Sequence, residues 1–95
     1  DGAAYRAAFE AKVLPALENF KPEFVFCSAG FDGHRDDPLA GFNLVETDYA
    51  WITERIMAVA TRHAQGRLVS FLEGGYDLNA LGRSAAAHIK VLAGL

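Results

Sequence analysis

The sequence contains a single cysteine, Cys27, among its 95 residues. An internal disulfide is therefore impossible, and a metal site built from several cysteines is excluded. No apolar run approaches the roughly 20 residues that a membrane-spanning helix needs, and we see no signal peptide at the start. We expect a protein of the reducing cytoplasm with no membrane partner, in which Cys27 is an inert thiol of the core.

Positive charges are also few. Lys and Arg number 9 against 12 Asp and Glu, the formal net charge is −3, and the basic residues form no cluster. This distribution offers no electrostatic footprint for nucleic acid or for an anionic membrane. Hydrophobic residues make up 52% of the chain, which excludes a disordered tail and indicates a buried core. The length allows one modest domain at most.

The first element is a helix. Apolar residues recur three and four positions apart over residues 3–20, which is the spacing of one helical stripe. Pro15 lies inside this stretch and lacks a backbone N–H, so we expect a kink or break near residues 11–15. Lys21 should end the helix, because the residue before a proline, here Pro22, is pushed out of helical geometry.

Two short apolar runs, residues 24–28 and 68–72, predict strands that are buried on both faces, as in a parallel sheet. Between them, Thr47 or Asp48 can cap a helix that runs to about His63. The sequence around these elements is loop-like and rich in glycine. The long loop of residues 29–45 exceeds the usual connection length, which more often marks a functional loop than a passive one.

The remaining signals lie around the second predicted strand. Gly66 is placed for a left-handed cap at the end of the middle helix. Asp77 or Asn79 can open a last helix that reaches about Leu92. Its apolar spacing predicts an inner face made of Leu78, Leu81, Ala85, Ile89 and Leu92.

The order helix, strand, helix, strand, helix predicts an α/β protein with a right-handed crossover and a parallel strand pair. Two parallel strands do not make a self-sufficient sheet, since such sheets need several neighbours and covered faces. We therefore expect part of a larger α/β sheet to be missing from the chain. An exposed sheet edge should also favour self-association of the isolated chain.

Two polar side chains follow the carboxyl ends of the two predicted strands, the edge where ligands bind in open α/β sheets. Asp32 follows the first strand, and Tyr76 follows the second. A carboxylate can ligate a metal, although a lone aspartate there is more often a loop cap. A tyrosine hydroxyl can stabilise an oxyanion, although Tyr76 could simply be a half-buried aromatic with a structural role only.

Other polar residues in the same loops are open to both functional and structural interpretations. Gly74 and Gly75 could bind phosphate, but they more simply allow the backbone to turn and aim Tyr76. His34, Asp36 and Asp37 suggest a metal cluster. Adjacent loop side chains cannot all converge on one ion, so we expect most of them to be solvated or capping, with Asp37-Pro38 a turn. His63 and His88 are expected at a surface or an interface.

Three segments in this order make the chain recognisable: Ser28-Ala29-Gly30-Phe31-Asp32, Asp37-Pro38-Leu39 and Leu72-Glu73-Gly74-Gly75-Tyr76. They resemble motifs of the histone deacetylase superfamily, and their residues are most similar to those of the class II branch and of acetylpolyamine amidohydrolases. The resemblance covers nearly the whole chain. It implies the three-layer arginase/deacetylase fold with a parallel sheet, of which residues 1–95 would be a single segment from the C-terminal part of the domain.

The resemblance also implies roles for particular residues. Asp32 matches one of the aspartates that hold a catalytic zinc ion, and Tyr76 matches the tyrosine that polarises the acetyl carbonyl. The expected pocket residues are Phe31, Leu39, Gly74 and Gly75. Leucine at position 39, on the rim of the channel, leans toward acetyl-lysine or another acetylated amine.

The function implied by the resemblance is zinc-dependent deacetylation. The tandem histidines and the Asp-x-His element of the family are not in the chain, so its partner would be the missing N-terminal portion of the domain. We expect no tight zinc binding by the 95 residues alone, since catalytic zinc ordinarily has three protein ligands. The alternatives are a non-catalytic structural or interaction module and, from Gly74 and Gly75 only, a nucleotide-binding fragment.

Overall fold

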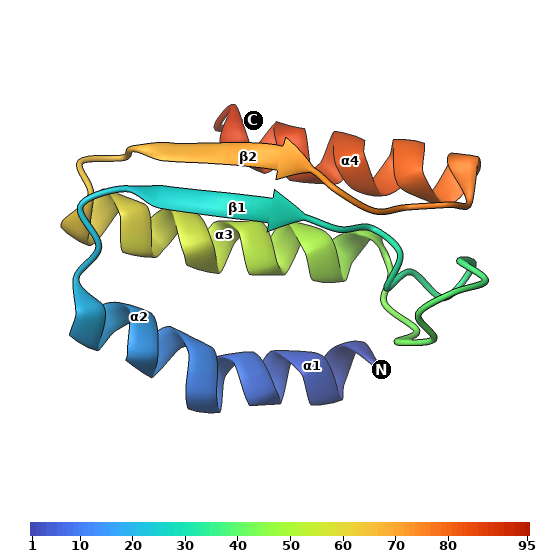
Figure 1. The fold of residues 1–95 in the computed structure, drawn as a ribbon, viewed down its shortest axis with the longest axis horizontal. Helices are drawn as coiled ribbons and strands as arrows, with labels where there is room; N and C mark the ends of the chain where they lie inside the picture. Colours follow the sequence, from blue (N-terminus) through green and yellow to red (C-terminus); the bar gives the residue numbers. More distant parts are fainter.

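All of residues 1–95 are described by a computed structural model, drawn in Figure 1. The predicted order of elements is confirmed. The chain forms α1 (Gly2–Ala8), the π-helical segment η1 (Phe9–Val13), α2 (Leu14–Phe20), β1 (Val25–Ala29), α3 (Glu46–His63), β2 (Leu68–Leu72) and α4 (Leu78–Leu92). None of these helices combines the length and apolarity that crossing a bilayer requires.

The two strands form a parallel pair, as predicted. Val25 pairs with Leu68 at one end and Ala29 with Leu72 at the other. The second strand has the predicted bounds, and β1 lies one residue later than predicted. Cys27 lies half-buried in β1, where burial raises the pKa of its thiol despite a hydrogen bond with Ser70. A raised thiol pKa disfavours the reactive thiolate, which agrees with an inert cysteine.

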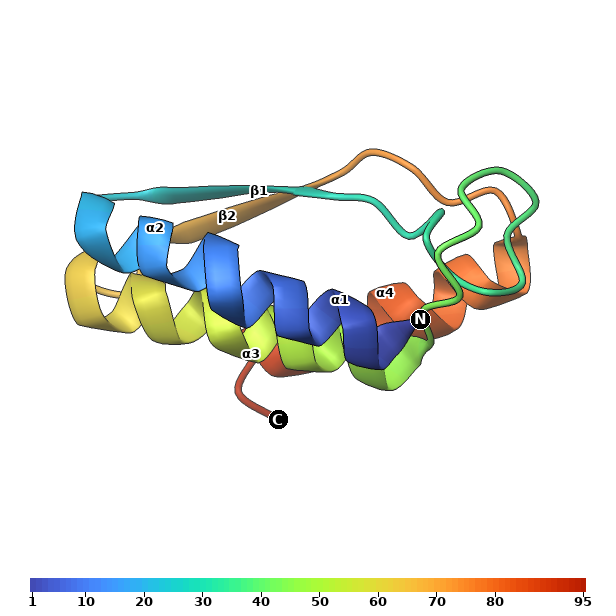
Figure 2. The ribbon, with the colours of Figure 1, turned by 90° about the horizontal axis from the view of Figure 1, so that it is seen from below.

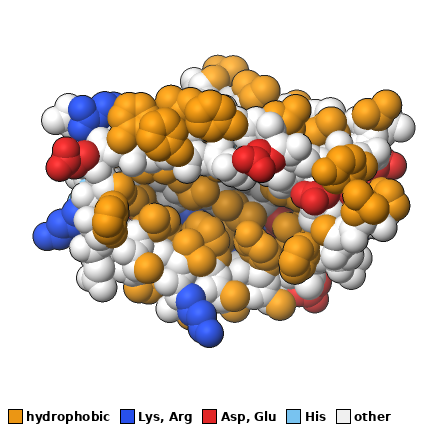
Figure 3. All heavy atoms as spheres, in the orientation of Figure 1, with side chains coloured by type: hydrophobic (Ala, Val, Ile, Leu, Met, Phe, Trp, Pro, Cys, Tyr) orange, Lys and Arg blue, Asp and Glu red, His pale blue; other side chains and the backbone are white.

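The helices lie on one side of the sheet, which leaves its other face uncovered (Figure 2). This open face carries Phe24, Phe26 and Phe71, which are 43%, 69% and 51% exposed. The ring centroids of Phe24 and Phe26 are 4.8 Å apart, and those of Phe26 and Phe71 are 6.2 Å apart. Hydrophobic side chains accordingly gather over the strands in Figure 3. A stacked aromatic face of this kind is typical of a surface that another element covers.

The predicted break in the first helix is confirmed, and it takes the form of a widened turn. The Leu14 N–H donates to the carbonyl of Phe9, five residues back, instead of four. This π-helical turn directly precedes Pro15, which cannot donate and whose ring would crowd a regular turn. The helix ends at Lys21, whose φ of 53° is left-handed. Lys21 thus leaves helical geometry before Pro22, as predicted.

The start of α3 differs from the prediction. The N-cap is Val45, and neither Thr47 nor Asp48 takes that position. Asp48 caps from the third helical position, where its carboxylate accepts the Val45 N–H at 3.0 Å. The same carboxylate pairs with Arg6 of α1 at 3.0 Å. Asp48 therefore begins the helix and holds α1 against it.

The predicted left-handed end of α3 is confirmed. Gly66 has a φ of +75°, and Gln65 before it has a φ of 55°. The Gly66 N–H donates to the carbonyl of Ala60 at 3.0 Å, which satisfies one of the last helical carbonyls. This closure turns the chain back into β2.

The predicted inner face of α4 is wrong at Leu78 and Ile89. Leu78 and Ile89 are 79% and 59% exposed, whereas the buried residues of α4 are Ala80, Ser84 and His88. This face packs on α3. The apolar pattern gave most weight to large side chains, but small side chains such as Ala80 and Ser84 let two helix backbones approach closely. Leu81 and Ala85 do pack against the core, at its edge.

His88 is a core residue, not a surface one. Its Nδ1 lies 2.8 Å from Thr53 Oγ1 on α3, and its Nε2 lies 2.8 Å from Ser70 Oγ on β2. Thr53 donates its own hydroxyl hydrogen to the Tyr49 carbonyl at 2.6 Å. Thr53 must therefore accept from Nδ1–H, so a neutral His88 accepts the Ser70 hydroxyl at Nε2. One imidazole thus joins two helices and the sheet.

Stability should depend on pH through His88. Burial lowers the pKa of His88 below its ordinary value of 6.5, so the unfolded chain binds this proton more readily than the folded chain. We expect the full free energy of unfolding above pH 6.5 and a loss as the pH falls from 6.5 toward the folded pKa. Urea unfolding from about pH 8 to pH 5 measures this slope. A His88→Gln variant should have a shallower slope, and an equal slope in both proteins would contradict the assignment.

Candidate active site at the carboxyl edge of the sheet

The loops after β1 and β2 leave the same edge of the sheet because the strands are parallel. Backbone hydrogen bonds continue the pairing past the strands. The Glu73 N–H donates to the Ala29 carbonyl at 2.9 Å, and the Phe31 N–H donates to the Gly74 carbonyl at 2.8 Å. This continued ladder fixes the register of the two loops, so that Asp32 lies beside Gly74.

Asp32 and Tyr76 line one hollow at this edge, with a volume of about 250 Å³. Its other lining residues are Ser28, Gly30, Glu73 and Gly74. Asp32 is half-buried, and Tyr76 is 57% exposed. The carboxylate oxygens of Asp32 accept no hydrogen bond from the rest of the chain, so they are free to bind a ligand.

Glycines make room for the Asp32 carboxylate. A Cβ at Gly74 would lie 3.0 Å from Asp32 Oδ1, and one at Gly30 would lie 3.1 Å from it. A side chain at either position would therefore press against the carboxylate, each from its own side. The two glycines thus form a cradle, which explains Gly74 without a bound phosphate and removes most of the basis for a nucleotide site.

Gly75 has a different role. Its φ of +138° belongs to a region that side chains rarely adopt, and a Cβ there would lie 2.8 Å from Leu81 Cδ1. Gly75 therefore lets the chain turn between the hollow and α4 directly before Tyr76. The sequence prediction that this glycine shapes the turn agrees with the geometry.

Alanine substitutions should distinguish a glycine that the turn requires, Gly75, from one that the helix α4 does not require, Gly82. Gly75→Ala is expected to lower the free energy of unfolding by about 1–3 kcal/mol, because it adds backbone strain and a clash. Gly82 on α4 is the matched control, since a Cβ there meets nothing within 4 Å. Gly82→Ala should raise the free energy of unfolding by about 0.5–1 kcal/mol. Urea unfolding tests both, and equal effects of the two variants would contradict this reading.

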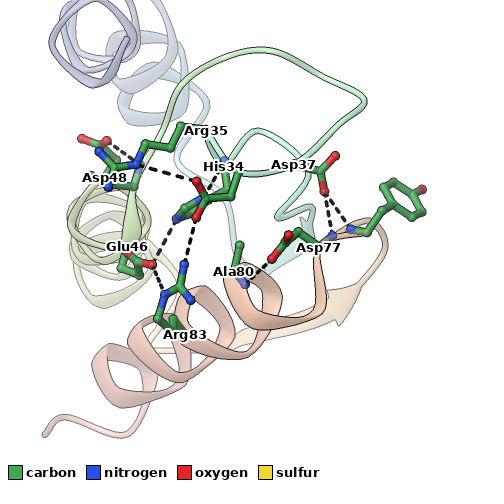
Figure 4. A network of polar contacts seen from close by, with 11 residues as sticks. His34, Arg35, Asp37, Glu46, Asp48, Asp77, Ala80 and Arg83 are labelled. Atoms are coloured by element: carbon green, nitrogen blue, oxygen red, sulfur yellow. Dashed lines mark hydrogen bonds and ion pairs between the residues drawn. The ribbon is translucent and has the colours of Figure 1, made fainter.

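Asp37 joins the two loops of the site. Its Oδ2 accepts the backbone N–H of Tyr76 at 2.8 Å and of Asp77 at 3.3 Å (Figure 4). Its Oδ1 accepts the N–H of Leu39 at 2.9 Å. Burial acts to raise the pKa of Asp37, but these N–H donors outweigh it and hold the pKa below its ordinary value. The expected capping role is confirmed, but the partners 39 and 40 residues away were not foreseen.

The loop after β1 is also anchored to the helices by a charged network. His34 is buried, so of the two expected roles, solvated or capping, it has the capping one. Its Nδ1 accepts the Asp36 N–H at 3.0 Å, and its Nε2 lies 3.0 Å from Glu46 Oε1 (Figure 4). Arg83 on α4 reaches Glu46 at 2.6 Å and Asp36 at 3.2 Å. The Arg83 hydrogen bond, with a smaller contribution from His34, lowers the pKa of Glu46 to about 2.

The remaining predicted pocket residues lie away from the hollow. Phe31 is 3% exposed and packs in the core, with its ring centroid 5.1 Å from that of Tyr49 and 5.7 Å from that of His88. Leu39 is 67% exposed. It lies in the same loop as Asp37, and its side chain does not line the hollow. The structure thus brings together Asp32, Gly74 and Tyr76.

Comparison with known proteins decides the family. The sequence profile of the histone deacetylase domain matches residues 1–92. The chain belongs to this family. Its predicted arginase/deacetylase fold class is confirmed by the solved structure of the histone deacetylase Clr3, which aligns with 99% of the chain at a TM-score of 0.90 and 34% identity.

Two relatives illustrate how this histone deacetylase segment compares in sequence. Type-2 histone deacetylase 2 of Dictyostelium discoideum is 49% identical in an alignment of 84 residues, which covers 85% of the chain and 5% of that protein. Histone deacetylase 10, chloroplastic, of Oryza sativa subsp. japonica is 41% identical over 91 residues, 96% of the chain and 20% of that protein. The aligned part of Clr3 is 15% of that chain. The chain therefore spans a minor part of the relatives it matches.

The histone deacetylase segment does not hold a complete metal site by itself. No group of three or more His, Cys, Asp or Glu side chains lies close enough together to bind a metal ion. Two carboxylates line the hollow, those of Asp32 and Glu73. Glu73 is exposed, whereas the half-buried carboxylate of Asp32 lies in a cradle that two glycines keep open, so Asp32 is the better placed ligand. A catalytic zinc ion ordinarily has three protein ligands, so the residues present fit one position of such a site and not the whole of it.

Proposed function

We propose that residues 1–95 are the C-terminal part of a zinc-dependent deacetylase domain that hydrolyses acetyl-lysine or another acetylated amine. The observation that carries the proposal is the shared hollow. Asp32 and Tyr76 come from different loops, and both line it at the carboxyl edge of the sheet. Membership in the histone deacetylase family supports the same reaction.

In this proposal Asp32 is a metal ligand and Tyr76 is a catalytic residue. Carboxylate oxygen is an ordinary zinc ligand, and the oxygens of Asp32 are not used by protein donors. Zinc would activate water and polarise the amide carbonyl when bound by the complete domain. Tyr76 would donate its hydroxyl hydrogen to the same carbonyl oxygen as negative charge develops there. No hydrogen bond within the chain competes for that hydroxyl.

The substrate would enter past the loop that follows β1, which contains Leu39. We propose that the exposed Leu39 side chain contributes apolar surface to the rim, which suits the methylene stem of acetyl-lysine. Gly74 and Gly75 keep the wall beside Tyr76 free of side chains. Phe31 would support this wall from the core, since a Cβ added at Gly75 would lie 3.3 Å from Phe31 Cβ.

The remaining metal ligands and catalytic histidines would come from the rest of the domain. The open aromatic face of the sheet is the proposed contact for that part of the polypeptide, because parallel strands are stable when both faces are covered. The cytoplasm remains the proposed compartment on the strength of a single free cysteine, although the relative from rice is named chloroplastic.

Without that covering part, the isolated chain should self-associate through its open face. We expect light scattering to give a mass above that of the monomer. Phe26→Lys combined with Phe71→Lys should restore the monomer, because both rings are more than half exposed on this face. Leu95→Lys is a matched control, since Leu95 is 85% exposed at the end of the chain and should not affect association. A monodisperse monomer of the unmodified chain would contradict the prediction.

The test of the proposed function is acetate release by the complete polypeptide that contains these residues, with an acetyl-lysine peptide and an acetylated polyamine as substrates. We expect release that a chelator abolishes and zinc restores. A second candidate, a non-catalytic interaction module, rests on the incomplete metal site, since no group of three or more His, Cys, Asp or Glu side chains lies together in these residues. Full metal loading without acetate release from either substrate would favour that candidate.

A further inference from the structure

We propose that Asp37 is a positioning residue for Tyr76, and that its carboxylate clamps the loop after β1 to the loop after β2. The inference rests on the proposed role of Tyr76 and adds a residue that acts through it. Asp37 touches neither the hollow nor the proposed metal ligand. It acts on the backbone from which the tyrosine side chain begins.

The clamp uses both oxygens of one buried carboxylate. Asp37 is 7% exposed. Oδ1 binds within its own loop, at the Leu39 N–H, and Oδ2 binds across to Tyr76 and Asp77. Pro38 between Asp37 and Leu39 has no N–H, so the side chain turns back to the next available donor. One oxygen thus fixes the carboxylate, and the other fixes the tyrosine backbone.

Little else holds Tyr76 in place. Its side chain is 57% exposed, and its hydroxyl makes no hydrogen bond within the chain. Gly75 before it adopts a φ of +138°, which only glycine reaches easily. Because Gly75 has no side chain, it does not restrict movement of Tyr76. The direction of the tyrosine therefore depends on where its backbone N–H is fixed. A misplacement of about 1 Å can cost about 10²-fold in rate.

A carboxylate is required because all three bound groups are N–H donors. Asparagine has the same size but one acceptor oxygen and an NH₂ group, so it can serve one loop and must present a donor to the other. Asp77 N–H is also fixed by this contact directly before α4, where the Asp77 side chain caps Ala80 N–H at 2.9 Å. The clamp therefore joins the catalytic turn to the start of that helix.

The test compares Asp37→Asn with Asp36→Asn in the complete, zinc-loaded deacetylase. Asp36 is the adjacent carboxylate and is 47% exposed. Its ion pairs with Arg35 and Arg83 lie at the surface, where such pairs contribute little, and its remaining contact is with His34 at 3.8 Å. We expect Asp37→Asn to lower kcat about 10²-fold with KM little changed and zinc content unchanged. The amide protons of Tyr76 and Asp77 should exchange faster. Asp36→Asn should match the parent protein in all of these measurements.

A double variant separates positioning from a loss of folding. In a Tyr76→Phe background the hydroxyl is absent, so Asp37→Asn should lower kcat no further. Asp37→Glu keeps both acceptors and should recover part of kcat, which keeps the test open if Asp37→Asn folds poorly. A further loss of equal size in the double variant, or full kcat in Asp37→Asn, would overturn the clamp. Full kcat in Tyr76→Phe would instead overturn the proposed function.

Discussion

Replacing Tyr76 with phenylalanine is expected to lower kcat for the proposed acetate release by the complete polypeptide by about 10²–10³-fold, with KM little changed. The substitution removes one hydroxyl from a side chain that lines the hollow with Asp32. A donor aimed at a developing oxyanion stabilises the transition state more than the bound substrate, so the loss falls on kcat. Initial-rate measurements with an acetyl-lysine peptide give both constants.

The control for this substitution removes the same atom elsewhere. Tyr5→Phe deletes a hydroxyl from α1, where the Tyr5 ring packs against Phe9 with centroids 6.4 Å apart. It should leave kcat and KM unchanged. Equal losses in the two variants, or none in Tyr76→Phe, would show that the hydroxyl of Tyr76 takes no part in the reaction.

Asp32→Ala is expected to have the largest effect of any single substitution, because it removes a proposed metal ligand. Residues that only support a ligand typically cost 10–100-fold in metal affinity, so the loss of a direct ligand should exceed about 100-fold. Acetate release should fall below detection at ordinary zinc concentrations. Bound zinc, measured by elemental analysis after dialysis, should fall in parallel.

Asp36→Ala provides the comparison for Asp32→Ala within the same loop. Its carboxylate is 47% exposed and pairs with Arg83 at the surface. We expect full zinc content and full activity in this variant. If Asp32→Ala retained stoichiometric zinc and turnover, Asp32 would be a loop cap, which is the alternative that the sequence left open.

Local sequence signals predicted most of the fold. Continuous apolar runs gave both strands, and Gly66 and Asp77 marked the end of α3 and the start of α4 because each satisfies backbone groups that lie within a few residues. The order of elements then implied the parallel pairing. Asp32 and Tyr76 could be placed at one edge for the same reason, since parallel strands end together.

The missed features depend on partners far away in the sequence. Asp37 looked like a turn residue because the Asp37-Pro38 pair explains one oxygen, and nothing local indicates what the other oxygen binds. His88 sits on a helix whose largest apolar residues suggested a different inner face. Its burial follows from Thr53 and Ser70, 35 and 18 residues away. Such contacts are set by tertiary packing, which a periodicity cannot show.

Anomalous diffraction at the zinc edge from crystals of the complete polypeptide tests most directly whether Asp32 and Tyr76 share one catalytic centre. We predict a zinc peak in the hollow, about 2.0–2.2 Å from a carboxylate oxygen of Asp32. The Tyr76 hydroxyl should face the same ion across the space for the substrate carbonyl. A zinc ion bound without Asp32, or the absence of a peak in the hollow of zinc-loaded and active protein, would contradict this assignment.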